Sequence, residues 1–132
     1  MPIEPKWLQV ETVRAIHQRQ TAEHGGDPAT RDAGALESAL ARPINLWAYS
    51  EPKPGLAELA ASYAFGIAKN HPFVDGNKRT SYVACRTFLL LNGGDFQADP
   101  AESYATWIDL AQSEISETEL AAWVRARMTS TE

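Results

Sequence analysis

The sequence predicts an all-α fold, built as a single-domain bundle of about six helices around a buried central helix. Its 132 residues match the commonest size of one domain, so we treat residues 1–132 as a unit. Ala and Leu number 21 and 11, whereas Ile and Val number 6 and 5, and this excess favours helices over strands. Glycine and proline residues divide the chain into segments of helical length.

The first half of the chain contains two expected helices and a loop. We expect the first helix from about Leu8 to Glu23, before a pair of glycines, and the second from about Asp32 to Ala41, before Pro43. Residues 43–55 contain three prolines and have no helical period. We therefore expect a loop or a short flap hairpin there.

The second half contains four expected helices. The third runs from about Leu56 to Asn70, with apolar residues at helical intervals. The fourth, from about Asn77 to Leu91, is apolar nearly all round, so we expect it to be the buried central helix. Capping-box patterns at residues 99–102 and 116–119 predict the starts of the last two helices.

Composition excludes several classes of protein. The net charge of −5 argues against a role that coats nucleic acid, and no apolar run reaches the roughly 18 to 20 residues of a membrane span. A single cysteine, Cys85, excludes an internal disulfide, and we expect a buried, inert thiol. His17 and His24 have no neighbouring ligands and do not predict a metal site. Residues 1–6 lack a secretory signal, so we expect a cytoplasmic protein.

Charge is unevenly distributed along the chain. Residues 98–132 hold two basic and seven acidic side chains, whereas residues 71–97 hold three basic and two acidic ones. The only net-positive stretch therefore lies in the middle of the chain, where it includes the connection between the third and fourth expected helices.

This connection, residues 70–80, reads NHPFVDGNKRT. It places Lys78 and Arg79 in the first turn of the fourth helix, where cations oppose the helix dipole by roughly 0.3–1 kcal/mol each. The same turn leaves backbone N–H groups without acceptors. Both features are explained if an anion such as a phosphate binds there, with Gly76 allowing a close approach and Asn77 adding a donor.

The other residues of the connection complete a set suited to phosphoryl transfer. Asp75 is a candidate ligand for Mg²⁺, and His71 has the ordinary pKa best suited to accept a proton from a hydroxyl near neutral pH. We expect Phe73 to anchor the loop to the core. Taken singly, each residue also fits a plain turn or a solvated surface. Together, beside an apolar helix, they indicate an active site.

Residues 71–79 resemble the signature of the Fic/Doc superfamily, and more closely its death-on-curing (Doc) branch. Residues 25–43 resemble the N-terminal pattern of the same branch, so the resemblance covers nearly the whole chain. It implies a toxin of a toxin–antitoxin system that transfers the terminal phosphate of ATP to a hydroxyl, a threonine of elongation factor Tu in this branch, and so inhibits translation. The implied site comprises a general base, His71, a Mg²⁺ ligand, Asp75, and phosphate-binding residues, Gly76, Asn77, Lys78 and Arg79.

Two departures from the Fic branch favour phosphate transfer over nucleotide transfer. Lys78 stands where Fic adenylyltransferases carry a second glycine, and Tyr82 stands where they carry a second arginine. A bulky cation crowds the nucleotide-transfer mode, and the missing arginine removes a phosphate clamp. Transfer of AMP or UMP to a protein hydroxyl stays open as an alternative, as does a non-catalytic protein-binding module.

The resemblance also implies a partner. Doc-like toxins are paired with a short, partly disordered antitoxin, whereas self-inhibited Fic proteins carry an inhibitory motif that ends in Glu followed by Gly or Asn. This chain has no such dipeptide, so we expect a separate antitoxin to inhibit it in trans. Residues 44–55 occupy the place of the family's flap, which aligns the target segment. We expect neither direct nucleic-acid binding nor membrane binding.

Overall fold

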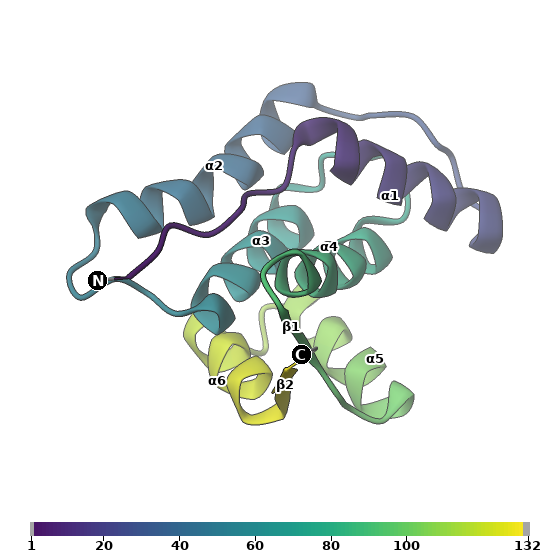
Figure 1. Ribbon diagram of the computed structural model, residues 1–132. Helices are drawn as coiled ribbons and strands as arrows, with labels where there is room; N and C mark the ends of the chain where they lie inside the picture. The colour runs from purple at the N-terminus through teal and green to yellow at the C-terminus, as the bar shows by residue number, and fades with distance from the viewer. Residues whose placement is uncertain (1, 131–132) are drawn as a thin grey trace.

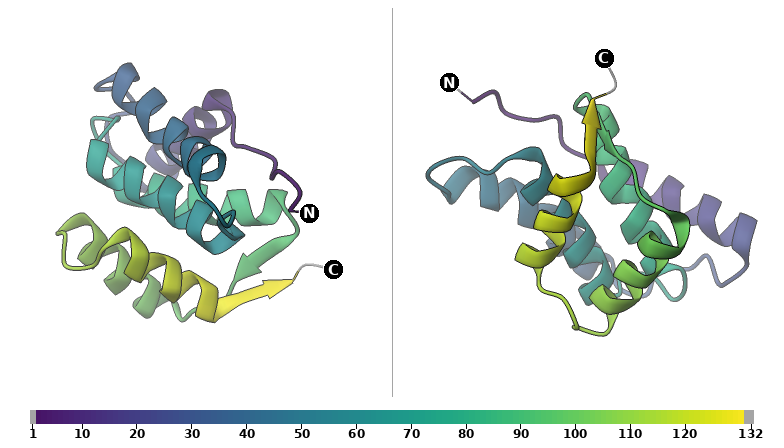
Figure 2. Two further views of the ribbon diagram at one scale, coloured as in Figure 1. Left: turned by 90° about the vertical axis from the view of Figure 1, so that its left-hand side faces the viewer. Right: turned by 90° about the horizontal axis from the view of Figure 1, so that it is seen from below.

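The computed structural model describes residues 2–130 and confirms the all-α class. Figure 1 shows three layers, with α1 and α2 above the central pair α3 and α4, and with α5 and α6 below it. Two short strands pair at one end of the lower layer (Figures 1 and 2). The elements of the described chain are, in order, α1 (Val10–His24), α2 (Ala33–Tyr49), α3 (Leu56–Asn70), α4 (Asn77–Leu91), β1 (Gly94–Phe96), α5 (Pro100–Ala111), α6 (Glu117–Arg127) and β2 (Met128–Ser130).

The most enclosed helix is α3, and the expectation that α4 takes this place is wrong. Ten of the 15 residues of α3 are buried, against six of the 15 in α4. Five of these buried residues of α3 are alanines, and Gly66 brings α3 close to α2, because a Cβ there would lie 3.1 Å from the Ala39 Cα. Small side chains on several sides let helices pack around α3. The apolar residues of α4 instead extend past the core, since Leu90 and Leu91 are exposed.

Helix α2 continues through Pro43 to Tyr49, so the loop expected from residue 43 is wrong over residues 43–49. An interior proline costs a helix about 3 kcal/mol. Here Pro43 is itself buried, in line with Leu36 and Leu40 on the same helical stripe, and burial of the continuous stripe offsets that cost. The flap hairpin is also absent among the described residues, because residues 50–55 form no strand.

The pairing of β1 with β2 is antiparallel and was not expected from the sequence. Gly94 pairs with Ser130 and Phe96 with Met128. Each strand has only three residues, too few for a period-2 pattern to be visible. Arg86 of α4 is linked to the middle residue of β1 by two hydrogen bonds to the Asp95 carboxylate, of 3.0 and 2.8 Å.

The two expected capping boxes differ in the structure. At the start of α6 the box is complete, with the Ser116 hydroxyl accepting from the Glu119 N–H and the Glu119 carboxylate accepting from the Ser116 N–H. At the start of α5, Asp99 accepts from the Ala101 N–H, but Glu102 pairs with Arg127 of α6 and does not complete the box. A tertiary ion pair therefore replaces the local contact.

Other sequence expectations concern burial. Cys85 is buried, as expected, and burial raises the pKa of its thiol, which keeps it protonated. Phe73 is also buried, as expected for the anchor of the α3–α4 loop. Over residues 2–130, no helix is both long enough and apolar enough to cross a bilayer.

The ion pair between Arg86 and Asp95 predicts a pH-dependent contribution to stability. Its hydrogen bonds lower the pKa of Asp95 in the folded protein below its ordinary value. The pair therefore contributes its full stabilisation above the ordinary carboxyl range, and the contribution is lost as the pH falls through the lowered pKa. Denaturant unfolding of the wild type and of Asp95→Asn from pH 7 to pH 3 checks this. We expect the difference in unfolding free energy to shrink toward acid pH, whereas a constant difference would contradict the assignment.

Candidate active site

The loop between α3 and α4, residues 71–76, carries the predicted site and begins and ends in the left-handed region. Pro72 disfavours the helical conformation at the residue before it, and α3 ends at Asn70. His71 then has φ +48°, which is uncommon for a residue other than glycine. Gly76 has φ +78° and immediately precedes α4. The loop reverses the chain between two adjacent helices and leaves the start of α4 at the surface.

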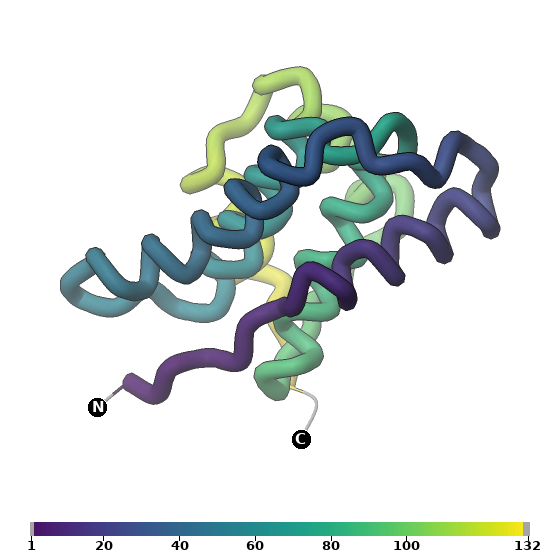
Figure 3. The backbone as a smooth tube through the Cα atoms, turned by 90° about the horizontal axis from the view of Figure 1, so that it is seen from above, coloured from purple at the N-terminus to yellow at the C-terminus, as the bar shows by residue number. Residues whose placement is uncertain are grey.

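A second loop, residues 25–32, holds the first one in place by backbone pairing. Figure 3 shows this second loop running from the end of α1 back to the start of α2. Thr30 forms an antiparallel bridge with Phe73, and the Arg31 N–H donates to the Pro72 carbonyl at 2.8 Å. The Val74 N–H donates to the Ala29 carbonyl at 3.1 Å. The conformation of the motif therefore depends on a segment about 45 residues earlier in the chain.

The Arg31 side chain fixes the backbone at His71. Its guanidinium donates from Nε to the His71 carbonyl at 2.5 Å and from Nη2 to the Asn70 carbonyl at 2.8 Å. The end of α3 leaves these carbonyls without N–H donors from the helix, and a cation is favourable there. Arg31 therefore stabilises the unusual backbone of His71, whose imidazole is exposed to solvent.

Asp75 is held through one of its carboxylate oxygens. Its Oδ2 accepts from the Asp27 backbone N–H at 2.8 Å. Gly26, at φ +113°, lies against this side chain, and a Cβ at residue 26 would approach the Asp75 Cβ to 3.0 Å. Both the conformation and the close approach therefore require glycine at residue 26. The hydrogen bond orients an exposed carboxylate beside the start of α4.

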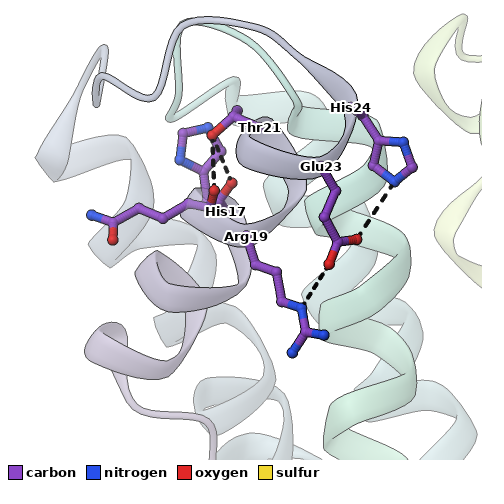
Figure 4. A network of polar contacts seen from close by, with 6 residues as sticks. His17, Arg19, Thr21, Glu23 and His24 are labelled. Carbon is purple, nitrogen blue, oxygen red and sulfur yellow. Dashed lines mark hydrogen bonds and ion pairs between the residues drawn. The ribbon is translucent and has the colours of Figure 1, made fainter.

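His17 of α1 supports the loop from beneath. It is 1% exposed, and its ring stacks on Phe73 with centroids 3.7 Å apart and planes 7° apart. Its Nε2 lies 2.8 Å from the Asp75 carbonyl oxygen, and since a carbonyl only accepts, the ring donates through Nε2–H. Figure 4 shows His17 and Thr21 on one side of α1 and the exposed contacts of Glu23 with Arg19 and His24 on another.

The bond from His17 also sets the direction of the next amide. The Asp75–Gly76 peptide is trans, so the Gly76 N–H points opposite to the carbonyl that faces His17. It therefore points away from the core. A left-handed residue followed by helical residues directs successive N–H groups toward one concavity, an arrangement that binds anions. Gly76 and the first turn of α4 have this order of conformations.

The remaining predicted residues lie at the start of α4. The side-chain amide of Asn77 accepts from the Phe73 N–H at 3.1 Å and donates to the Phe73 carbonyl at 2.9 Å, so it braces the loop. Its backbone N–H, with those of Lys78 and Arg79, precedes the first intrahelical hydrogen bond of α4, from Thr80 to Gly76. Lys78 and Arg79 are exposed, and the first turn contains no acidic residue. The six predicted site residues therefore occupy one loop and one helical turn.

Comparison with known proteins identifies the family. Residues 7–89 match the Fic/DOC family. The chain belongs to the Fic/Doc family. It is 32% identical over 118 residues to the protein kinase Doc of Escherichia phage P1, covering 89% of this chain and 92% of the phage protein. It is 43% identical over 82 residues to the toxin Doc of Mycolicibacterium smegmatis, a match that spans 59% of this chain and only 63% of that toxin. Both relatives support the predicted Doc branch.

Sequence reasoning missed the residues that support this Fic/Doc loop. Arg31 and Gly26 lie within the segment that resembles the Doc pattern. The sequence therefore marked these two residues, but it did not indicate that they support the loop. His17 had no such signal, because it lies 58 residues before Asp75 and its only notable feature was its spacing from His24. In the described structure His17 faces the core and His24 is exposed, so the two rings do not form a pair.

His17→Phe tests the support beneath the loop. The phenyl ring preserves the stack on Phe73 but removes the donor to the Asp75 carbonyl. Leaving a partly buried carbonyl without its donor costs about 1–3 kcal/mol, so we expect the unfolding free energy to fall by that amount. Urea unfolding measures it, with Gln18→Ala as the matched control, because the Gln18 side chain is exposed on the same turn. Equal stability of the two variants would contradict the role of this bond.

Proposed function

We propose that this protein is the toxin of a toxin–antitoxin pair and a protein kinase that transfers the γ-phosphate of ATP to a serine or threonine hydroxyl. The observation that carries the proposal is the left-handed Gly76 directly before the first turn of α4, a turn whose two exposed cations have no acidic neighbour in it. The match to the phage kinase over 89% of the chain supports the same activity. The whole of residues 1–132 would act as one catalytic domain.

In the proposed reaction, His71 accepts the proton of the target hydroxyl. The hydroxyl oxygen forms a bond to the γ-phosphorus, the bond between that phosphorus and the β–γ bridging oxygen breaks, and ADP leaves. The N–H groups of Gly76 and Asn77, with the Lys78 and Arg79 side chains, stabilise the charge on the phosphate oxygens. Arg31 acts on this step by holding the backbone at His71.

The residues present fit a nucleotide with a divalent cation. Asp75 is an exposed carboxylate with one oxygen oriented by the Asp27 N–H, and hard cations such as Mg²⁺ prefer oxygen ligands of this kind. We therefore propose Asp75 as the Mg²⁺ ligand and ATP as the substrate. When bound, Mg²⁺ neutralises phosphate charge.

Transfer of AMP or UMP is the second candidate activity, and the surroundings of Tyr82 argue against it. The place of the second Fic arginine is filled by an aromatic ring that packs on Trp107 and Phe96, with centroids 5.0 and 5.8 Å away. This ring offers no charge to clamp a phosphate. A non-catalytic binding module is the third candidate, but such a module has no need for an exposed histidine held in a left-handed conformation.

The proposal extends to partners. By analogy with the Doc branch, we propose that the target is a translation factor such as elongation factor Tu, modified on a threonine, and that a short antitoxin inhibits the toxin in trans. The small area of positive charge serves a few phosphates and does not suit a nucleic-acid duplex. A cytoplasmic location follows from such a target.

Labelled ATP distinguishes the three activities. The protein is incubated with a bacterial extract and ATP labelled at the α- or γ-phosphate, and protein labelling is measured. We expect label from the γ-position only, loss of labelling on chelation of Mg²⁺, and parallel inhibition of cell-free translation. His71→Ala should reduce the labelling rate by about 10²–10⁴-fold, because it removes the general base.

His24→Ala is the matched control, because His24 is an exposed histidine outside the loop, and it should label at the wild-type rate. Label from the α-position would instead establish nucleotide transfer. The absence of any label, with translation inhibited equally by wild type and His71→Ala, would leave the binding module.

A further inference from the structure

A pocket of about 380 Å³ lies on a face of the molecule that the chemistry described above does not use. Figure 2 (left) shows this face, on which α3 lies between α2 and α6. The polar residues that line the pocket are Arg42, Asn45, Tyr49 and Ser50 from the second half and the end of α2, Ser62 of α3 and Glu117 of α6. None of the six proposed site residues lines it.

Ser62 supplies the observation that points to a ligand. The residue is 1% exposed, yet its side chain lines the pocket, and within residues 2–130 its hydroxyl forms no hydrogen bond. The hydroxyls of Thr80 and Ser103 are also unpaired there, but they are sealed from solvent, so no ligand can reach them. An unpaired buried hydroxyl costs stability, and a ligand in the pocket would remove that cost by forming the missing hydrogen bond with Ser62.

The charged groups of the pocket compensate each other, so the ligand should be neutral. Arg42 forms an ion pair with Glu117, and its guanidinium also lies over the Phe65 ring, 5.1 Å from the centroid. A carboxylate in the pocket would be repelled by Glu117, and an ammonium by Arg42. A guanidinium only donates hydrogen bonds, a carboxylate only accepts them, and the exposed Asn45 amide does both. This combination matches a neutral group that both donates and accepts, such as a peptide amide.

One stripe of α3 connects the pocket to the proposed base. Ser62, Phe65 and Lys69 recur at intervals of three and four residues, so they share one face of the helix. At 1.5 Å per residue, Lys69 lies about 10 Å beyond Ser62, and His71 follows two residues later. An extended polypeptide covers about 3.3 Å per residue, so about four residues would connect the pocket to His71.

We propose that this pocket binds an extended, uncharged segment of the protein substrate, with a main-chain amide of that segment hydrogen-bonded to Ser62 and Asn45. The segment lies about four residues from the hydroxyl that receives the phosphate, and the exposed Tyr49 ring packs against it. The inference rests on the proposed function, because it requires a protein substrate. It gives that substrate a second contact area, outside the phosphate-binding loop.

Labelling of a bacterial extract by the full chain with γ-labelled ATP, at increasing extract concentration, tests the proposal. The extract concentration that gives half-maximal labelling of the strongest labelled protein measures substrate binding. Ser62→Ala and Asn45→Ala should each raise this concentration about fivefold, as expected for the loss of one hydrogen bond. Tyr49→Ala should raise it as well, because the packing surface is lost. The maximal rate and the KM for ATP should stay within about twofold of the wild type, because these variants leave the general base and the phosphate-binding residues in place.

Two matched controls lie outside the pocket. Ser103→Ala removes another buried, unpaired hydroxyl, and so matches Ser62→Ala. Gln18→Ala removes an exposed side-chain amide from α1, and so matches Asn45→Ala. Both controls should give the half-maximal concentration of the wild type.

The outcomes separate this inference from the proposed function. Unchanged half-maximal concentrations in Ser62→Ala and Asn45→Ala would overturn the docking pocket while the kinase proposal stands. A lower maximal rate at an unchanged half-maximal concentration would also overturn it, because the pocket would then not act on substrate binding. An effect of Asn45→Ala that disappears between about 50 and about 300 mM NaCl would contradict an uncharged ligand. No labelling by the wild type at any extract concentration would overturn the proposed function itself.

Discussion

The backbone pairing between residues 29–32 and 72–74 is the constraint on which the candidate site depends. It joins the α1–α2 connection to the α3–α4 loop and holds two left-handed residues, His71 and Gly76, in a loop that would be strained in isolation. The Arg31 guanidinium donates to the His71 carbonyl at the start of the same loop, and the Asp27 N–H donates to the Asp75 carboxylate near its end. The start of α4 is thereby exposed, with its N–H groups directed outward.

His17 extends this support into the core. Its ring covers Phe73, and its donor turns the Asp75 carbonyl inward, so that the following N–H points outward. The six residues of the motif are therefore not an independent unit. Three of the elements that support them, α1, the 25–32 loop and α3, lie earlier in the chain, within the residues 7–89 that match the Fic/DOC family.

Much of this fold could be predicted from local patterns, and the failures have physical causes. The bounds of α3 and α4 lie at the predicted residues, because Pro72, Gly76 and the glycines after α4 act locally. The end of α2 was misplaced because burial of a continuous stripe outweighed a local proline signal. The strand pair joins segments 34 residues apart in sequence, and the support from His17 spans 58 residues. No short-range pattern predicts such contacts, whereas the candidate site could be proposed from the sequence because its six residues lie within nine positions.

We propose above that the backbone amides at the start of α4 bind the phosphates of the substrate. Two-dimensional amide NMR of the full chain, titrated with Mg²⁺ and a non-hydrolysable ATP analogue, tests it most directly. We expect the largest shifts at the N–H groups of Gly76, Asn77 and Lys78. These shifts should be weaker in His17→Phe, because the Gly76 N–H is then no longer held outward. Saturating binding with the largest shifts elsewhere in the chain would contradict it.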